Sequence, residues 1–225
     1  LKKPTLTKKQ RHRLRVQQVR RQKIFLTCLF LLIVGCILLR FSKFSGRQEE
    51  AHQINAACEA YRDEVSSEAA QYDMSDYVDL ILAVMMQESS GQGTDPMQSS
   101  EGAYNTRYPQ QPNGITDPSY SISCGIQELK YALDKAGCTG PTDLSKIRLA
   151  LQAYNFGADS YFAYLEENGQ TVWTAQSAQA FAQMASGNTQ RDEDDPLHDP
   201  AGPWDYGDQY YPDHVLRYYH LDNNS

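Results

Sequence analysis

An almost unbroken apolar run from Ile24 to Leu39 constrains the fold of this 225-residue chain more than any other feature. At about 1.5 Å per helical residue the run covers roughly 24 Å, which falls short of the roughly 30 Å hydrocarbon core of a membrane. Arg40 can extend its charged end to the membrane surface, and Phe41 lengthens the apolar stretch. We therefore predict a single transmembrane helix over residues 24–41, with little tilt.

Charge is divided unevenly between the two sides of this run. Ten Lys and Arg residues precede it, three follow it closely, and all 28 Asp and Glu residues come after Gln48. The positive-inside rule then places residues 1–23 in the cytoplasm as a basic tail, and everything after a polar linker over 42–53 outside the cell. A cleaved signal peptide is the alternative, because the run is near the length of a signal core. The basic lead is long for a signal peptide, however, and no A-x-A site follows the run closely.

The outer part of the chain is strongly acidic. From residue 48 onward it carries eight basic and 28 acidic side chains, a net charge of about −20. A protein that neutralises phosphates needs a basic face, so we predict no nucleic-acid partner. The length allows one ordinary domain with appendages but hardly two full cores.

Metal-ligating patterns are weak. An acidic stretch over 192–199 offers oxygen ligands for Ca²⁺, but it lacks an EF-hand pattern and is expected to be a solvated loop. No Cys/His spacing resembles a zinc site, and we predict neither a metal nor a cofactor. Of the three outer cysteines, Cys124 and Cys138 are candidates for a disulfide, with free or buried thiols as the alternative.

The hydrophobic periodicity beyond the linker is helical. We predict helices over residues 54–72, 76–88, 126–136, 144–155, 158–168, 174–185 and 212–219. The stretch from 91 to 124 is rich in Gly, Pro, Asn, Ser and Tyr and is predicted to be a long loop, with a small hairpin as its one chance of a strand. Another loop is predicted over 188–207. Long loops in compact domains are often functional. The predicted fold class is therefore mainly α.

Glu88 is the first candidate for catalysis. It lies at the end of the most apolar helix, one turn after Val84 and two turns after Ile81. Desolvation and the negative end of the helix dipole both raise the pKa of a carboxyl group in this position. A glycosidase needs such an acid, still protonated near neutral pH, to protonate the leaving oxygen. Taken alone, an ordinary exposed glutamate at a helix end is the simpler interpretation.

Four short motifs follow one another in a recognisable order. They are Glu88-Ser89-x-Gly91, Gly125-Ile126-Gln127, Ala153-Tyr154-Asn155-x-Gly157 and Tyr211-x-x-x-Val215-Leu216-x-Tyr218. With them, residues 54–221 resemble the goose-type lysozyme and soluble lytic transglycosylase superfamily, and within it the lysozyme-like domain of CwlT-type proteins from conjugative transposons of Gram-positive bacteria. Residues 222–225 would be a tail. The resemblance implies a muramidase that cleaves peptidoglycan between N-acetylmuramic acid and N-acetylglucosamine.

The same resemblance assigns roles to individual residues. Glu88 would be the catalytic acid, and Gln127 would line the sugar groove. Tyr154 and Asn155 would sit beside the acid, with the Tyr154 hydroxyl helping to orient it, and Tyr211 would be a further groove residue. For both tyrosines the alternative is packing in the core, because tyrosine commonly buries its ring.

The second carboxylate of standard glycoside hydrolysis is harder to find. Asp95 and Asp117 lie in the predicted loop and could position a water, although neither belongs to a matching motif. If neither serves, Glu88 would act first as acid and then as base, and the sugar's own 6-hydroxyl would close a 1,6-anhydro ring, as in lytic transglycosylases. We favour hydrolysis.

Two functions compete on this sequence. The first is a membrane-anchored enzyme that opens the wall locally for a conjugation or secretion apparatus. The second is a non-catalytic module of the same fold that binds glycan or secretion partners. A groove that brings Glu88, Tyr154 and Gln127 together would favour the enzyme. CwlT-type proteins usually carry a second, cysteine-peptidase domain, and we assign no peptide-bond cleavage to this sequence.

Overall fold

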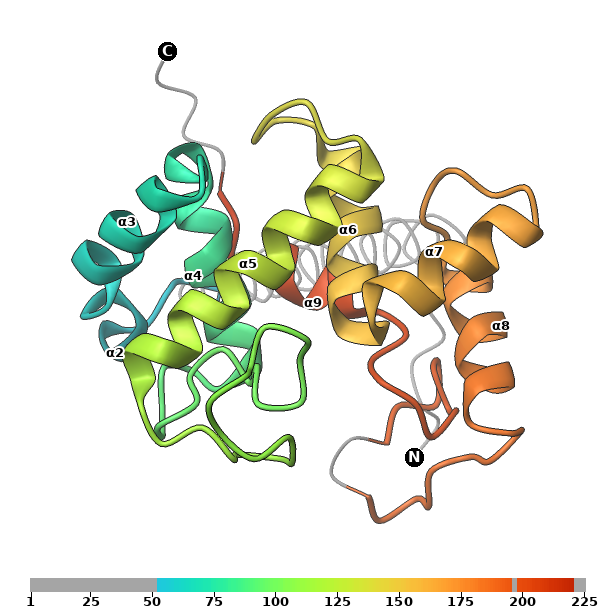
Figure 1. The fold of residues 1–225 in the computed structure, drawn as a ribbon. Coiled ribbons are helices and arrows are strands. Elements are labelled where there is room, and N and C mark those ends of the chain that lie inside the picture. Colours follow the sequence, from blue (N-terminus) through green and yellow to red (C-terminus); the bar gives the residue numbers. More distant parts are fainter. Residues whose placement is uncertain (1–51, 196–197, 221–225) are drawn as a thin grey trace, which may run out of the picture. The chain divides into compact units, whose positions relative to one another are not determined.

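The computed structural model describes residues 52–195 and 198–220. The predicted cytoplasmic tail and transmembrane helix lie outside these residues. Within the described part, no helix is both long and apolar enough to cross a membrane. A compact unit begins at Ile54. Its described residues form helices and loops, with one isolated β-bridge between Gln190 and Trp204 and no strand, which confirms the mainly helical prediction (Figure 1).

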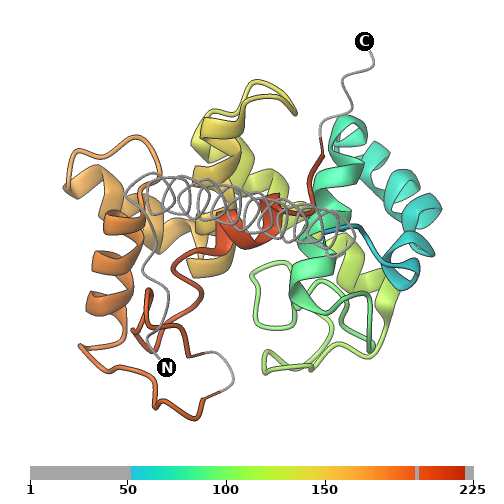
Figure 2. The same cartoon turned by 180° about the vertical axis from the view of Figure 1, so that it is seen from behind.

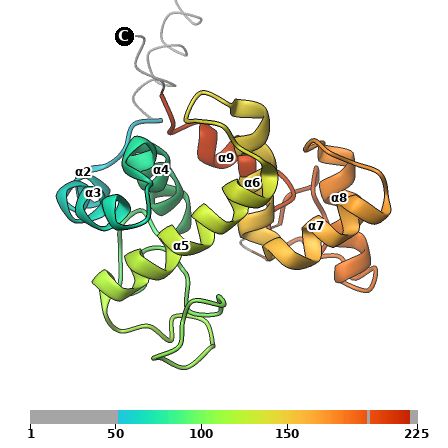
Figure 3. The same ribbon diagram turned by 45° about the horizontal axis from the view of Figure 1, so that its top comes forward.

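The helices fall into two groups on either side of a central pair. The first group comprises α2 (Ala56–Glu59), α3 (Arg62–Gln71), the 3₁₀ turn η1 (Ser75–Tyr77) and α4 (Val78–Glu88). The central pair is α5 (Pro118–Ala136) and α6 (Leu144–Phe156), and the second group is α7 (Ala158–Glu167) and α8 (Ala175–Ala185). Figure 3 shows α5 and α6 between the two groups. The short α9 (Tyr211–Leu216) packs against both α4 and α6, as the view from behind shows (Figure 2).

Helix α4 forms the centre of the core. Its six consecutive residues from Leu80 to Met85 are fully buried, because α2, α3 and α9 all pack against it. This burial agrees with the apolar composition of the helix predicted over 76–88, and the helix ends at Glu88 as predicted. The side-chain carboxyl group of Glu88, at the end of α4, is consequently held at a fixed place in the domain.

The predicted helix over 54–72 is in fact two helices. Asn55 caps α2 by accepting a hydrogen bond from the Cys58 N–H at 2.8 Å, and its amide donates to the Ser90 carbonyl at 3.0 Å. This second bond ties the start of α2 to the turn after α4; α2 ends at Glu59, and α3 begins at Arg62.

Helix α5 begins at Pro118 rather than at Ile126, so the predicted loop over 91–124 was too long. Asp117 caps the helix by accepting hydrogen bonds from the Ser119 and Tyr120 N–H groups, and proline suits the first helical turn. Small residues on this turn hid its periodicity. The preceding loop packs closely on α5 further along the helix: a Cβ atom at Gly125 would lie 2.6 Å from the Met97 Cβ.

A buried carboxylate anchors that loop. Asp95 is 1% exposed and accepts hydrogen bonds from the Ser99 N–H at 3.0 Å, the Ser100 N–H at 3.1 Å and the Ser121 hydroxyl at 2.6 Å. The Ser100 hydroxyl is a fourth donor. Because Ser121 belongs to α5, these bonds fix the loop against α5.

Candidate active site

The carboxyl group of Glu88 lies at the end of α4, where protein atoms crowd it on most sides. The residue is half-buried, and its carboxylate accepts a hydrogen bond from the Tyr211 hydroxyl. Burial raises the pKa of Glu88 to about 7, against the hydrogen bond from Tyr211, which lowers it. The negative charges of Asp208, Asp95 and Glu128 make smaller contributions to this raised pKa. Glu88 can therefore keep its proton close to neutral pH, as a general acid must.

Two stacked tyrosines support the acid. The rings of Tyr211 and Tyr154 lie 6.3 Å apart with 23° between their planes. Tyr211, the first residue of α9, is 2% exposed and donates to Glu88. The Tyr154 hydroxyl donates instead to the Met97 carbonyl at 3.0 Å. The hydroxyl that orients the acid was expected from Tyr154 but comes from Tyr211, because the Tyr154 hydroxyl is hydrogen-bonded to the Met97 carbonyl.

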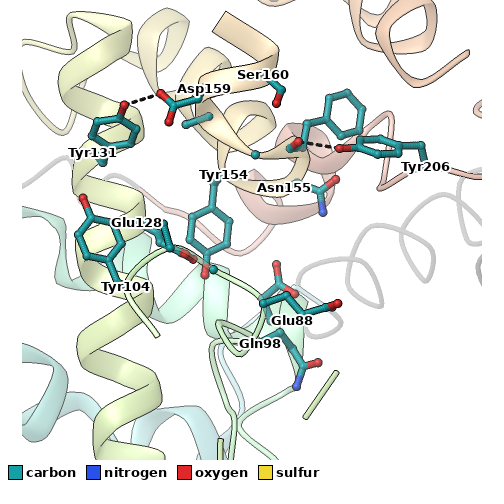
Figure 4. Close-up of a pocket in the computed structure, with 16 residues that line it drawn as sticks. Glu88, Gln98, Tyr104, Glu128, Tyr131, Tyr154, Asn155, Asp159, Ser160 and Tyr206 are labelled. Carbon is teal, nitrogen blue, oxygen red and sulfur yellow. Dashed lines mark hydrogen bonds between the residues drawn. The ribbon is translucent and has the colours of Figure 1, made fainter. Parts of the chain in front are cut away.

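Two cavities meet at Glu88. One, the Glu128 cavity, has a volume of about 620 Å³ and is lined among others by Glu101, Tyr104, Glu128, Tyr131, Tyr154 and Asp159 (Figure 4). The other, the Arg217 cavity, has a volume of about 690 Å³ and is lined among others by Gln87, Asp208, Tyr211, His214 and Arg217. Glu88, Gln98 and Asn155 line both. The acid therefore stands at the junction of two spaces that an extended ligand could occupy together.

Glu128 is a site residue that sequence reasoning missed. Its carboxyl group faces the Glu128 cavity close to Tyr154 and is packed so tightly against Gly102 that a Cβ atom there would lie 1.5 Å from its Oε1 atom (Figure 4). Burial raises the pKa of Glu128 to about 7, while the backbone N–H groups of Ala103 and Tyr104 act in the opposite direction. The sequence held one signal: Glu128 is three residues after Gly125, and so on the same helix face.

Gln127 is not brought to the acid. Its amide donates to the Ser123 carbonyl at 3.1 Å, one turn earlier on α5, and the residue lines neither the Glu128 cavity nor the Arg217 cavity. Consecutive residues of an α-helix point roughly 100° apart, so the face that directs Glu128 into its cavity directs Gln127 elsewhere. Its predicted place in the sugar groove stays a prediction.

The two aspartates proposed to position water lie outside both cavities. Asp95 is buried with four hydrogen-bond donors around it, and Asp117 caps α5. Neither lines the Glu128 cavity or the Arg217 cavity. Asp95 still acts on the site at a distance, because its charge raises the pKa of Glu88. A water-positioning role for either residue stays a prediction.

Asn155 connects the acid to the loop before α9. Its carbonyl oxygen accepts a hydrogen bond from the Asp208 N–H at 2.7 Å, and its residue lines both cavities. In Figure 4 the side-chain amide of Asn155 faces the space above Glu88. The placement expected for Asn155, beside the acid, agrees with this geometry.

The three described cysteines are free thiols, so the candidate Cys124–Cys138 disulfide does not form. The Cys124 thiol donates to the Tyr104 carbonyl at 3.4 Å, whereas the Cys138 thiol lies 3.6 Å from the Tyr77 hydroxyl. Among the described residues, no group of three or more His, Cys, Asp and Glu side chains is placed to hold a metal ion.

The helical domain and the partly desolvated acid beside its cavities agree with a lysozyme-like fold. The chain belongs to the Lysozyme-like family, whose family model matches residues 56–219. This confirms the resemblance that the four motifs indicated.

Individual relatives agree with the family assignment. The chain is 36% identical over 173 residues to the bifunctional muramidase/DL-endopeptidase CwlT of Bacillus subtilis (strain 168), a match that covers 77% of this chain and 43% of CwlT. It is 40% identical over 111 residues to the uncharacterized membrane protein YocA of the same strain, covering 49% and 45%. The pneumococcal vaccine antigen A homolog of Streptococcus pyogenes serotype M1 is 37% identical over 110 residues, covering 49% and 50%. The chain thus spans half or less of the length of these relatives.

A solved structure shows the same arrangement. The crystal structure of a protein described as similar to a lipoprotein of the NLP/P60 family, from Staphylococcus aureus subsp. aureus Mu50, superposes with a TM-score of 0.62 at 27% identity. The match covers 77% of this chain and 56% of that one.

Proposed function

We propose that this chain is a muramidase that cleaves the glycan strands of peptidoglycan between N-acetylmuramic acid and N-acetylglucosamine. One observation carries the proposal: the Glu88 carboxyl group, with its pKa raised to about 7, stands at the junction of two cavities. A glycan strand is an extended ligand, and its scissile bond has to lie beside an acid of this kind. Membership of the family and the similarity to CwlT support the same activity.

In the proposed reaction, protonated Glu88 gives its proton to the leaving glycosidic oxygen. The Tyr211 hydroxyl points its hydrogen at the carboxyl group and so favours the ionised form that remains after proton transfer. The same hydrogen bond fixes the direction of the carboxyl group before the transfer. Burial raises the pKa of Glu88 and the hydrogen bond from Tyr211 lowers it. The balance between these two effects sets the pH range in which Glu88 can act as the acid.

Glu128 is the carboxylate that we propose for the second role in hydrolysis. Hydrolytic enzymes of this kind use a carboxylate that holds the water or attacks the sugar directly. Of the other carboxylates that line the Glu128 cavity, Glu101 is exposed and Asp159 is bonded to Lys135 and Tyr131. Asp95 and Asp117 remain the earlier candidates for the same role. A lytic transglycosylase that uses Glu88 alone is the alternative reaction.

Mass spectrometry of digested Gram-positive peptidoglycan tests the activity and the reaction together. A hydrolase leaves reducing N-acetylmuramic acid ends, whereas a transglycosylase leaves anhydro ends that are lighter by one water. If the purified chain releases no soluble fragments but binds the strands, a non-catalytic glycan-binding module replaces this proposal.

The cellular setting rests on the sequence. We propose that residues 24–41 anchor the chain in the membrane with the lysozyme-like domain outside, where it opens the wall locally for a conjugation or secretion apparatus. Protease added to intact protoplasts should digest the domain while leaving residues 1–23 protected. Protection of the domain would reverse the proposed orientation.

A further inference from the structure

Arg217 is a cation without a matching carboxylate in a domain that is rich in carboxylates. Its guanidinium donates to the neutral Gln87 side chain at 2.9 Å and lies 4.8 Å from the centre of the Tyr218 ring. Among the described residues, no Asp or Glu forms an ion pair with it. Five of the seven other Lys and Arg residues in the described part of the chain pair with a carboxylate: Arg62, Lys130, Lys135, Arg148 and Arg191. The charge of Arg217 is therefore available beside Glu88.

The other charged residues that line the Arg217 cavity do not form an ion pair with Arg217. Asp208 already has a partner in His214: the His214 Nδ1 atom lies 2.5 Å from the Asp208 Oδ2 atom, and this hydrogen bond raises the pKa of His214. Arg191 lies 3.5 Å from Asp205, and Asp199 is the remaining acid that lines this cavity besides Glu88. The Glu128 cavity is different, since its lining includes three further carboxylates and no Lys, Arg or His.

Two amide groups add hydrogen-bond donors to the same place. The Asn155 carbonyl oxygen is held by the Asp208 N–H, but its NH₂ group donates to no described residue. Gln87 likewise uses its oxygen to accept from Arg217, and its NH₂ group donates to no described residue. Both residues line the Arg217 cavity. A ligand that offers carbonyl or carboxylate oxygens would satisfy these donors.

We propose that the Arg217 cavity binds the carboxylate-bearing peptide that peptidoglycan carries on its muramic acid residues. This inference rests on the proposed function. Arg217 would contact a peptide carboxylate, and Gln87 and Asn155 would contact carbonyl oxygens of the peptide or its lactyl link. The carboxylates of the Glu128 cavity would repel the same peptide, so the charge difference sets the direction in which the strand crosses Glu88.

Binding separates this inference from the proposed activity. The full chain carrying Glu88→Gln is titrated with peptide-bearing strand fragments, with the same fragments stripped of peptide by an amidase, and with a poly(glycerol phosphate) as a second source of anions. We expect tighter binding of the peptide-bearing fragments, and we expect Arg217→Gln to weaken that binding about tenfold without affecting the stripped fragments. Arg107→Gln is the matched control, because Arg107 is exposed over Tyr120 and lines neither cavity.

Each other result overturns the inference. If the chain binds both kinds of fragment equally, or if Arg217→Gln weakens the binding of both equally, the peptide does not bind in the Arg217 cavity. Displacement by the phosphate polymer with the same dependence on Arg217 would assign the cavity to a phosphate. The proposed function fails separately, if the unsubstituted chain cleaves neither substrate while the Arg217-dependent binding persists.

Discussion

The two cavities that meet at Glu88 differ in chemistry although they share three lining residues. The Glu128 cavity combines carboxylates with tyrosine rings and has no Lys, Arg or His in its lining, whereas the Arg217 cavity combines Arg191 and Arg217 with side-chain amides and with Asp199 and Asp208. The difference separates two tasks. Sugar rings are neutral and can lie on aromatic faces beside a carboxylate, whereas a charged substituent needs a cation. Glu88, between them, takes its raised pKa from burial and from carboxylates on both sides, Glu128 and Asp208.

Removing the shared acid should have the largest effect. Glu88→Gln keeps the shape of the side chain and an acceptor for Tyr211 but cannot donate a proton. General acid catalysis contributes typically 10²–10⁴-fold, so the release of muropeptides should fall by about 10³-fold with an unchanged circular dichroism spectrum. Full activity in this variant would show that Glu88 is not the catalytic acid, and the two cavities would then not lie on either side of the catalytic group.

Removing the second carboxylate tests the sugar-binding side of the comparison. Glu128→Gln should lower the rate of hydrolysis about 10²-fold. The control is Asp134→Asn, an exposed acid on the same helix that pairs with Lys130. If Glu128→Gln forms reducing ends at an undiminished rate, the role of the second carboxylate returns to Asp95 or Asp117. If the unsubstituted chain forms only anhydro ends, the reaction needs no second carboxylate.

Tyr211→Phe should shift the pH dependence of the reaction. The hydrogen bond from Tyr211 lowers the pKa of Glu88, so its loss raises that pKa and moves the alkaline limb of the pH–rate profile upward by about one unit. The rate at the optimum should fall about tenfold, because the carboxylate loses a charge-assisted bond worth about 1.5–3 kcal/mol. Tyr154→Phe loses only its bond to Met97 and should leave the limb in place. Identical shifts in the two variants would contradict the assignment.

The smallest predicted effect is on stability. The pKa of Glu88 and that of Glu128 are each raised from an ordinary value of 4.5 to about 7, so the folded state holds these protons more strongly than the unfolded state. The free energy of unfolding should therefore fall as the pH rises from about 4.5 to about 7. Allowing for partial solvent exposure, we expect about 1–2 kcal/mol for each residue. Urea titrations at pH 5 and pH 8 should show this loss of stability, and the loss should be smaller in Glu88→Gln and in Glu128→Gln. If both variants lose as much stability as the unsubstituted chain, the prediction is wrong.

The sequence by itself determined the helical class, the buried character of α4 and the place of Glu88 at its end. Each depends on local pattern, since apolar residues at helical spacing identify a core helix and Ser89 to Gly91 end it. The motif order also identified the family. The start of α5 was missed although its signal was local, because Asp117-Pro118 is a strong cap followed by small residues that conceal the periodicity.

Only the tertiary structure decided which side chains surround the acid. Glu128 and Gln127 are neighbours in sequence, yet the packing of α5 against the loop at Met97 and Gly102 turns one into the cavity and the other away. Tyr211 is 123 residues from Glu88, and its hydroxyl reaches the carboxyl group because α9 packs on α4. Arg217 stands beside the acid for the same reason. Helical spacing fixes which residues share a face, but the partner of that face depends on contacts between distant segments, which local pattern does not specify.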